Sequence, residues 1–316
     1  MFEIRKFLLL SLFLCSQVYA NCEQPKSYGL LNETTLIDDL ATLSSAKMSG
    51  RKTGSIGSVN ARNFLQARFK KIGVANFPQR AEYIQTFPFP NNSANNQGFN
   101  IVGWLKGNTF ADQFIVVTAH YDHLGAKGRH VYYGADDNAS GVATLLAIAG
   151  KISELGLAHS VIFLATDAEE QGLYGAKAFI KNLPISKNNI KLNINLDMLC
   201  EGGRKNRLYA TFTRADQQLA NIVKNVADIA GLCFINGHRK NQRFDRFERK
   251  INWRKSSEHA AFAKAGIPYL FVGGGVHKRY HTPKDNFENI DKEFYVSAAE
   301  TAWLLLQAAD AYQVLN

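Results

Sequence analysis

Long hydrophobic runs are absent from this chain of 316 residues once the first twenty are passed. A membrane-spanning helix needs roughly 20 consecutive apolar residues, so this absence excludes an integral membrane segment from the remainder. Nucleic-acid-binding motifs, internal repeats, low-complexity tracts and linkers between separate cores are missing as well. We therefore expect one folded domain that has no nucleic-acid partner.

The first twenty residues have a different character from the rest. Two basic residues precede an apolar run, Phe7–Leu14, and Ala20 is the small residue that signal peptidase requires. We predict that residues 1–20 are a signal peptide, that residues 21–316 are the mature domain, and that the protein is exported to the periplasm or out of the cell. A membrane anchor is the alternative, but the apolar run is shorter than a span.

Cysteine is also scarce, because the chain has four cysteines and one of them lies in the predicted signal peptide. Cys22, Cys200 and Cys233 remain after cleavage. Export permits a disulfide, and the odd number leaves one cysteine over. We expect Cys200 to pair with Cys233, although spacing alone leaves the other pairings open.

The formal net charge is +10, which favours anionic partners in general but also simply keeps a protein soluble. The stretch from His238 to Lys255 holds eight of the Lys and Arg residues against only Asp245 and Glu248. This stretch is typical of a solvated surface loop. The alternative is a loop that attracts acidic peptides or an anionic envelope to the protein.

Apolar periodicity predicts helices and strands that alternate along the chain. Two strands, at 100–105 and 114–118, are separated by a turn and are expected to form a hairpin or to be neighbours. Further elements follow in alternation: a helix at 140–155, a strand at 160–166, a helix at 173–183, a strand at 190–196, and so on to a closing helix at 291–315. Such alternation indicates parallel strands with crossover helices. We predict a single α/β domain of three layers, with a mixed, mainly parallel sheet flanked by helices.

Ionisable residues follow several of these strands directly, at the edge of the sheet where open α/β folds bind their ligands. They are His120 and Asp122, then Asp136 and Asp137, then Asp167, Glu169 and Glu170, then Asp197, and finally His281 in Tyr-His-Thr-Pro-Lys-Asp. A lone Asp at a strand end is usually a helix cap, and a lone His is usually a surface or core residue. The whole group is explained better by a bound cation, because unpaired carboxylates brought together would repel one another.

These residues resemble the exported di-zinc aminopeptidases, a family that also includes glutaminyl cyclases and glutamate carboxypeptidase. The resemblance extends from Gly50 to the closing helix and implies a zinc-exopeptidase fold with two Zn²⁺ ions per chain. It implies five metal ligands: Asp137 as the bridge, His120 and Asp197 for one ion, and Glu170 and His281 for the other. It further implies that Glu169 is the general base and that Asp122 orients the imidazole of His120.

The chemistry of the residues agrees with these roles. Two cations held by one carboxylate lower the pKa of a shared water and polarise a peptide carbonyl. Glu169 can then take the proton of that water and pass it to the departing amine. Imidazole and carboxylate ligands without thiolate suit Zn²⁺ best and also accept Mn²⁺ or Co²⁺. The expected activity is removal of N-terminal residues from peptides with a free N-terminus.

Two positions depart from the pattern of the family. Glu258 stands in Ser-Glu-His where the family usually has Asp, and Cys200 stands where it often has Gly. A thiol at position 200 is either a competing zinc ligand or a small buried residue. Two rival functions stay open: a glutaminyl cyclase with a single zinc, and a binding module that has lost its metals. The complete ligand set and Glu169 favour the peptidase.

Overall fold

The computed structural model describes residues 24–79, 82–90, 97–213, 216–238 and 251–311. The predicted signal peptide, Cys15, Cys22 and most of the basic stretch lie outside these ranges. No helix within them combines the length and the apolar character that crossing a bilayer requires.

An eight-stranded mixed sheet forms the middle layer, in the order β1-β2-β6-β3-β7-β10-β8-β9. The strands are β1 (Ile84–Pro88), β2 (Gln97–Leu105), β3 (Phe110–His120), β6 (His159–Thr166), β7 (Ile190–Asp197), β8 (Arg207–Phe212), β9 (Cys233–Asn236) and β10 (Tyr269–Gly273). The central strands β6, β3, β7 and β10 are parallel, whereas β1, β2 and β8 run antiparallel to their inner neighbours. The predicted fold class is therefore confirmed.

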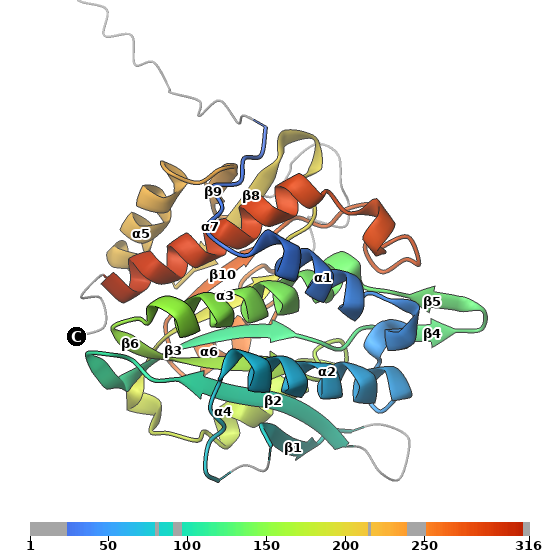
Figure 1. Ribbon diagram of the computed structural model, residues 1–316, viewed down its shortest axis with the longest axis horizontal. Helices are drawn as coiled ribbons and strands as arrows, with labels where there is room; N and C mark the ends of the chain where they lie inside the picture. The colour runs from blue at the N-terminus through green and yellow to red at the C-terminus, as the bar shows by residue number, and fades with distance from the viewer. Residues whose placement is uncertain (1–23, 80–81, 91–96, 214–215, 239–250, 312–316) are drawn as a thin grey trace, which may run out of the picture.

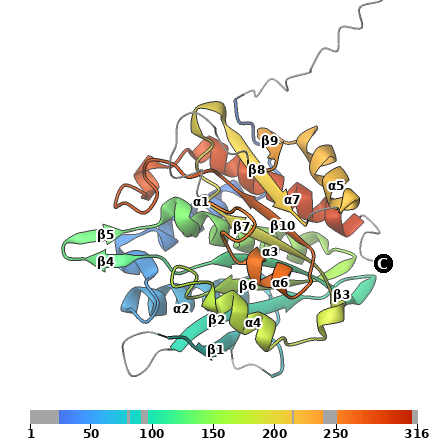
Figure 2. The same cartoon turned by 180° about the vertical axis from the view of Figure 1, so that it is seen from behind.

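Helices cover both faces of the sheet (Figures 1 and 2). One face packs against five helices: α1 (Glu33–Leu43), α2 (Ile56–Ile72), α3 (Gly141–Leu155), α5 (Gln217–Ala227) and α7 (Lys292–Ala311). The opposite face packs against α4 (Tyr174–Lys181) and α6 (His259–Lys264), with Phe179 and Phe262 against Val116 and Ile162. Alternate residues of the inner strands point to opposite faces, so these strands are apolar on both sides.

Local signals in the sequence set the helix ends. The side chain of Asn32 accepts the N–H of Thr35 at the start of α1, and the side chain of Asp216 accepts two N–H groups at the start of α5. Both are N-caps that satisfy otherwise free donors. Gly73 ends α2 at φ 87°, a conformation that glycine adopts without strain.

Two expectations, about a strand pairing and about the disulfide, are wrong, and one pair of strands was missed. The strands at 100–105 and 114–118 are not neighbours, because β6 lies between β2 and β3. A small hairpin of β4 (Gly125–Lys127) and β5 (His130–Tyr132) follows β3 and was not predicted. Cys200 carries a free, buried thiol while Cys233 is disulfide-bonded, so the two do not pair.

The N-terminal part of the described chain belongs to the domain. Glu300 in α7 accepts the N–H groups of Tyr28 and Leu30 at 2.7 and 2.8 Å, together with the hydroxyl of Ser27. Leu31 and three leucines of α1 are buried in the main core. Residues 27–43 therefore stabilise the fold through contacts with elements far along the chain.

Candidate functional site

The predicted metal ligands converge at the carboxyl ends of the parallel strands. His120 ends β3, Asp197 ends β7 and Glu170 follows β6. Asp137 lies in a helical turn (Ala135–Ser140) before α3, and His281 lies in the segment between β10 and α7. Because β3 lies between β6 and β7, its end is the point of the sheet where side chains from three parallel strands meet.

Two groups of ligand atoms share Asp137. The first consists of His120, Asp137 and Asp197, and the second of His123, Asp137, Glu170 and His281; within each group the ligand atoms lie within 4.8 Å of one another. One carboxylate oxygen of Asp137 is 3.3 Å from Nε2 of His120, and the other is 3.0 Å from Nε2 of His281. The two oxygens of one carboxylate therefore face two different sites.

Several polar atoms of these groups have no hydrogen-bond partner among the described residues, although all are buried. They are both ring nitrogens of His123, Oε1 of Glu170, Oδ1 of Asp197 and Nε2 of His281. Buried polar atoms in proteins normally have a partner. Imidazole nitrogens and carboxylate oxygens that converge in this way fit divalent cations, and the lack of thiolate is compatible with Zn²⁺.

The charge balance of the site favours cations. Burial would raise the pKa of Asp137, but the imidazoles of His123, His120 and His281 hold that pKa well below its usual range. For His281, burial lowers the pKa, yet Asp137 and Glu170 raise it to about 10. Carboxylates that attract a proton so strongly will attract a dication for the same electrostatic reason.

The tautomer of His120 suits a metal ligand. Its Nδ1 lies 3.1 Å from the backbone carbonyl oxygen of Asp122, which can only accept, so Nδ1 carries the proton and Nε2 is free to face Asp137 and Asp197. The carboxylate of Asp122 is 4.0 Å from Nδ1. That carboxylate accepts the backbone N–H groups of Glu169 at 3.0 Å and Glu170 at 3.4 Å. Asp122 thus links the loops after β3 and β6.

Glu169 lines the same cavity as the ligands but belongs to neither ligand group. Burial raises its pKa well above the usual value, and the nearby carboxylates of Glu258, Asp197 and Glu170 act in the same direction. A raised pKa brings a carboxylate closer to that of a general base working near neutral pH. Glu258 itself is buried and accepts the hydroxyls of Thr166 and Ser257.

Two residues outside the predicted set hold the backbone of the site. The carboxylate of Asp285 accepts the N–H groups of Asp136 at 2.8 Å and Asp137 at 3.1 Å. Arg51 is fully buried. Its guanidinium donates to four carbonyl oxygens, at distances from 2.6 to 2.8 Å, which belong to Leu43, Tyr121, Tyr133 and Gly134. Arg51 therefore holds both the start and the end of the segment that connects β3 to Asp137.

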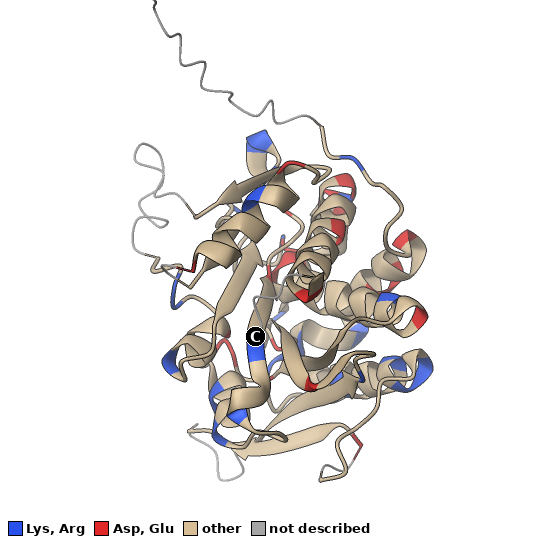
Figure 3. Ribbon diagram, turned by 90° about the vertical axis from the view of Figure 1, so that its left-hand side faces the viewer, with Lys and Arg blue, Asp and Glu red and all other residues tan. Residues whose placement is uncertain are grey.

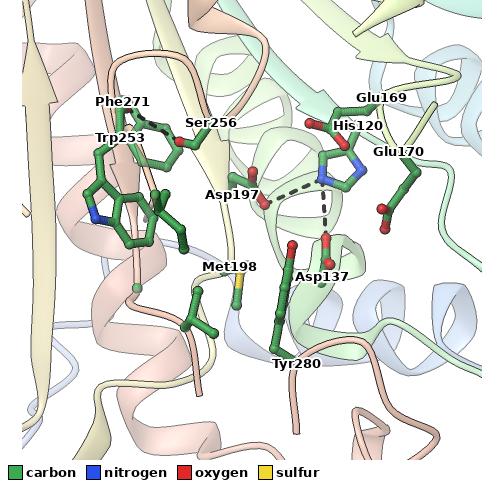
Figure 4. A pocket seen from close by; sticks show the side chains of 13 residues that line it. His120, Asp137, Glu169, Glu170, Asp197, Met198, Trp253, Ser256, Phe271 and Tyr280 are labelled. Carbon is green, nitrogen blue, oxygen red and sulfur yellow. Dashed lines mark hydrogen bonds and ion pairs between the residues drawn. The ribbon is translucent and has the colours of Figure 1, made fainter. Parts of the chain in front are cut away.

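A cavity of about 260 Å³ opens beside the ligands. Figure 4 shows His120, Glu169 and Glu170 on one side and Trp253, Phe271 and Ser256 on the other. Ile251, Met198 and Val276 add to the apolar lining. Tyr280 also lines the cavity, and its ring stacks on that of His281 with centroids 3.8 Å apart.

Sequence reasoning missed His123, Tyr280, Asp285 and Arg51. The signals were present, since His123 stands three residues after His120, Tyr280 directly precedes His281, and Asp285 belongs to the same motif as His281. Cys200 is in neither ligand group. Its backbone N–H donates to Asp136 and burial raises the pKa of its thiol, so it is a small buried residue here.

The basic stretch lies largely outside the described residues, which leave out 239–250. In the view of Figure 3, lysines and arginines are spread over several helices and loops, with acidic residues among them.

Comparison with known proteins identifies the family. The sequence model described as Peptidase family M28 matches residues 100–306, more than half of the chain. The chain belongs to peptidase family M28. It is 29% identical over 236 residues to aminopeptidase YwaD of Bacillus subtilis, covering 71% of this chain and 46% of that protein. It is 27% identical over 254 residues to leupeptin-inactivating enzyme 1 of Streptomyces exfoliatus, covering 79% and 50%.

Solved structures of the M28 type share the fold. A zinc aminopeptidase from Bacillus subtilis superposes with a TM-score of 0.69 at 17% identity, covering 90% of this chain and 99% of that chain. Glutaminyl cyclase from Porphyromonas gingivalis gives the same TM-score at 19% identity, covering 88% and 98%. The chain spans about half the length of the curated relatives it matches.

Proposed function

We propose that this M28 peptidase is an aminopeptidase that holds two Zn²⁺ ions and removes N-terminal residues from peptides. The observation that carries the proposal is the carboxylate of Asp137, whose two oxygens face two ligand groups at the end of the same cavity. A leader at residues 1–20 favours export, so we propose peptides outside the cytoplasm as the substrates.

The metal pair, when bound, supplies acidity to a water molecule and polarisation to the substrate carbonyl. Asp137, His120, Asp197, Glu170 and His281 hold it. Glu169 accepts the proton of the attacking water and then delivers it to the departing amine, since it is the carboxylate of the cavity that no ligand group uses. The pKa of Glu169, raised by burial, supports this role.

The size of the cavity favours an exopeptidase. About 260 Å³ is below the roughly 300–1,000 Å³ of most small-molecule sites, so it accommodates one residue rather than a stretch of extended chain. The apolar wall opposite Glu169 can receive the side chain of that residue. The phenol of Tyr280 can donate a hydrogen bond to the substrate from the same cavity.

The test is hydrolysis of a panel of amino-acyl chromogenic amides by the purified protein, with and without a chelator. We expect chelator-sensitive release of the free amine, restored by zinc. A glutaminyl peptide scored for ring closure is assayed in parallel, because a glutaminyl cyclase shares the fold. Clean cyclisation without hydrolysis of any amide would contradict the proposal.

The substitution Glu169→Gln probes the general base. It removes the proton acceptor at constant size, and we expect kcat to fall by about 10²–10⁴-fold, the usual contribution of general acid–base catalysis. Zinc content should stay at the wild-type level because Glu169 is not a ligand. Full turnover in Glu169→Gln would show that another group takes the proton.

A further inference from the structure

His123 lies in the loop between β3 and β4, and its side chain is completely buried. It lies beside three of the groups that face the second site. Its Nδ1 is 2.8 Å from Oε1 of Glu170 and 3.7 Å from Oδ2 of Asp137. Its ring centroid is 5.7 Å from that of His281, and the two rings meet edge to face at 67°. Both imidazoles can therefore present a nitrogen to the same point without stacking.

The hydrogen bonding of His123 is unusual for a buried imidazole. A buried histidine normally uses one ring nitrogen as donor and the other as acceptor. Neither nitrogen of His123 makes a hydrogen bond to any described residue, and neither does Oε1 of Glu170. Nδ1 and Oε1 are close, but they are not aligned as donor and acceptor. Both atoms are therefore close together and available to an ion bound between them.

The backbone around the ring leaves it little freedom. Gly134 has φ 59°, and a Cβ at that position would lie 2.6 Å from ring atoms of His123. Only glycine leaves room for the ring there. The ring is thus packed against the segment that leads into Asp137, and its direction is set before any ion binds.

We propose that His123, through Nδ1, is a fourth protein ligand of the ion held by Asp137, Glu170 and His281, and that it makes the two metal sites unequal. The site of His120, Asp137 and Asp197 has three protein ligands. Four protein ligands are typical of closed, tightly held zinc sites, and three are typical of sites that keep a position open for water or substrate. The four-ligand site fills first and retains its ion; the three-ligand site exchanges its ion and takes up the substrate.

The inference rests on the proposed two-metal site, and its test is metal binding rather than turnover. The metal-free protein is titrated with zinc in competition with a chromophoric chelator. For the wild type we expect two ions of clearly different affinity. In His123→Gln, which keeps much of the side-chain volume, the tighter affinity should fall by more than about 100-fold. Loss of a mere outer-shell partner already costs roughly 10- to 100-fold.

The control is His130→Ser in β5, which removes an exposed histidine of the neighbouring hairpin and should leave both affinities unchanged. Wild-type affinities in His123→Gln would overturn the role of His123 and leave the two-metal site intact. Failure of the wild type to bind any zinc would instead contradict the two-metal site itself.

A measurement on the wild type alone covers the case in which the variant does not fold. X-ray absorption of the protein loaded with one equivalent of zinc counts the imidazoles around that ion. The proposal gives two, from His123 and His281. A count of one would overturn it, because each site has only one imidazole if His123 does not bind.

Discussion

At the scale of residues, the phenol of Tyr280 is placed to donate a hydrogen bond in the cavity. Its ring stacks on that of His281, a predicted metal ligand, and its phenol faces the carboxylates of Asp137 and Asp197 in the cavity (Figure 4). Burial raises the pKa of the phenol, and the carboxylates of the site raise it further. The hydroxyl therefore stays protonated near neutral pH, and it is available as a hydrogen-bond donor.

We expect Tyr280→Phe to lower kcat by about 10²–10³-fold, the usual cost of losing one donor to the charge that develops on a reacting carbonyl. KM should change much less, because that charge is absent from the bound substrate. Steady-state kinetics on an amino-acyl amide measure both constants. Zinc content, measured in parallel, should not change, and an unaltered kcat would exclude the phenol from the reaction.

His120, Asp197 and Glu170 lie together because they stand at or just after the ends of neighbouring parallel strands, and strand ends can be predicted from apolar runs. His123 and Asp285 could not be assigned in the same way. His123 lies three residues beyond His120, where β3 ends, and the apolar pattern of the sequence does not show where its ring points. Asp285 acts on the backbone of Asp137 across 148 positions of the chain, a contact that only the folded structure reveals.

At the scale of elements, the segment before α6 and strand β10 form the apolar wall of the cavity, and His259 at the start of α6 packs behind that wall. His259 stacks on Phe271 with ring centroids 4.6 Å apart. Its Nε2 lies 2.9 Å from the carbonyl oxygen of Trp253, and its Nδ1 faces the side-chain amide of Asn195. Burial lowers the pKa of His259 to about 4, although the bond to Trp253 acts in the opposite direction.

This shift predicts how stability depends on pH. Above the unfolded-state pKa of about 6.5 His259 is neutral in both states, and its contribution is fully present. Between 6.5 and about 4 the unfolded chain binds a proton that the folded protein does not, so stability falls by roughly 1.4 kcal/mol per pH unit. From pH 7 to 5 the wild type should lose about 2 kcal/mol more than His259→Gln, measured by urea unfolding of the metal-free protein. Equal losses would show that His259 is protonated in the folded state.

The existence of the elements was easier to predict than their pairing. The alternation of helices and strands along the chain predicted the central parallel strands, because a crossover helix must connect one parallel strand to the next. The same reasoning misplaced β2 beside β3, since a short connection permits a hairpin but does not require one. The strands β4 and β5 have three residues each, too few for any period to be visible. The pairing of β2 and the formation of β4 and β5 depend on tertiary packing.

For the whole molecule, the ligands connect distant parts of the chain. The segment between the first and last of them, His120 and His281, includes β6, β7 and β10, three of the four central parallel strands. Without cations the carboxylates of Asp137, Glu170 and Asp197 remain close together at the end of this core, where they repel one another. We therefore expect the proposed ions to stabilise the fold as well as the site.

Metal removal should therefore lower the melting temperature. A ligand present at 100 times its dissociation constant adds about 2.7 kcal/mol per site to the free energy of unfolding. For a domain of this size we expect a decrease of several degrees on treatment with a chelator, measured by differential scanning calorimetry. Added zinc should reverse the decrease, and magnesium at the same concentration should not, because it prefers all-oxygen ligands. A melting temperature that does not change when the chelator is added would contradict this prediction.

The two sides of the cavity have separate origins in the chain. The side with the predicted ligands comes largely from the ends of β3, β6 and β7, whereas Trp253 and Phe271 opposite come from the segment before α6 and from β10 (Figure 4). For the proposed aminopeptidase activity, we therefore expect that exchanging the second set alone changes the preference for the first amino acid of a peptide. The residues proposed to carry out the reaction and the residues proposed to select the substrate therefore come from different segments of the chain.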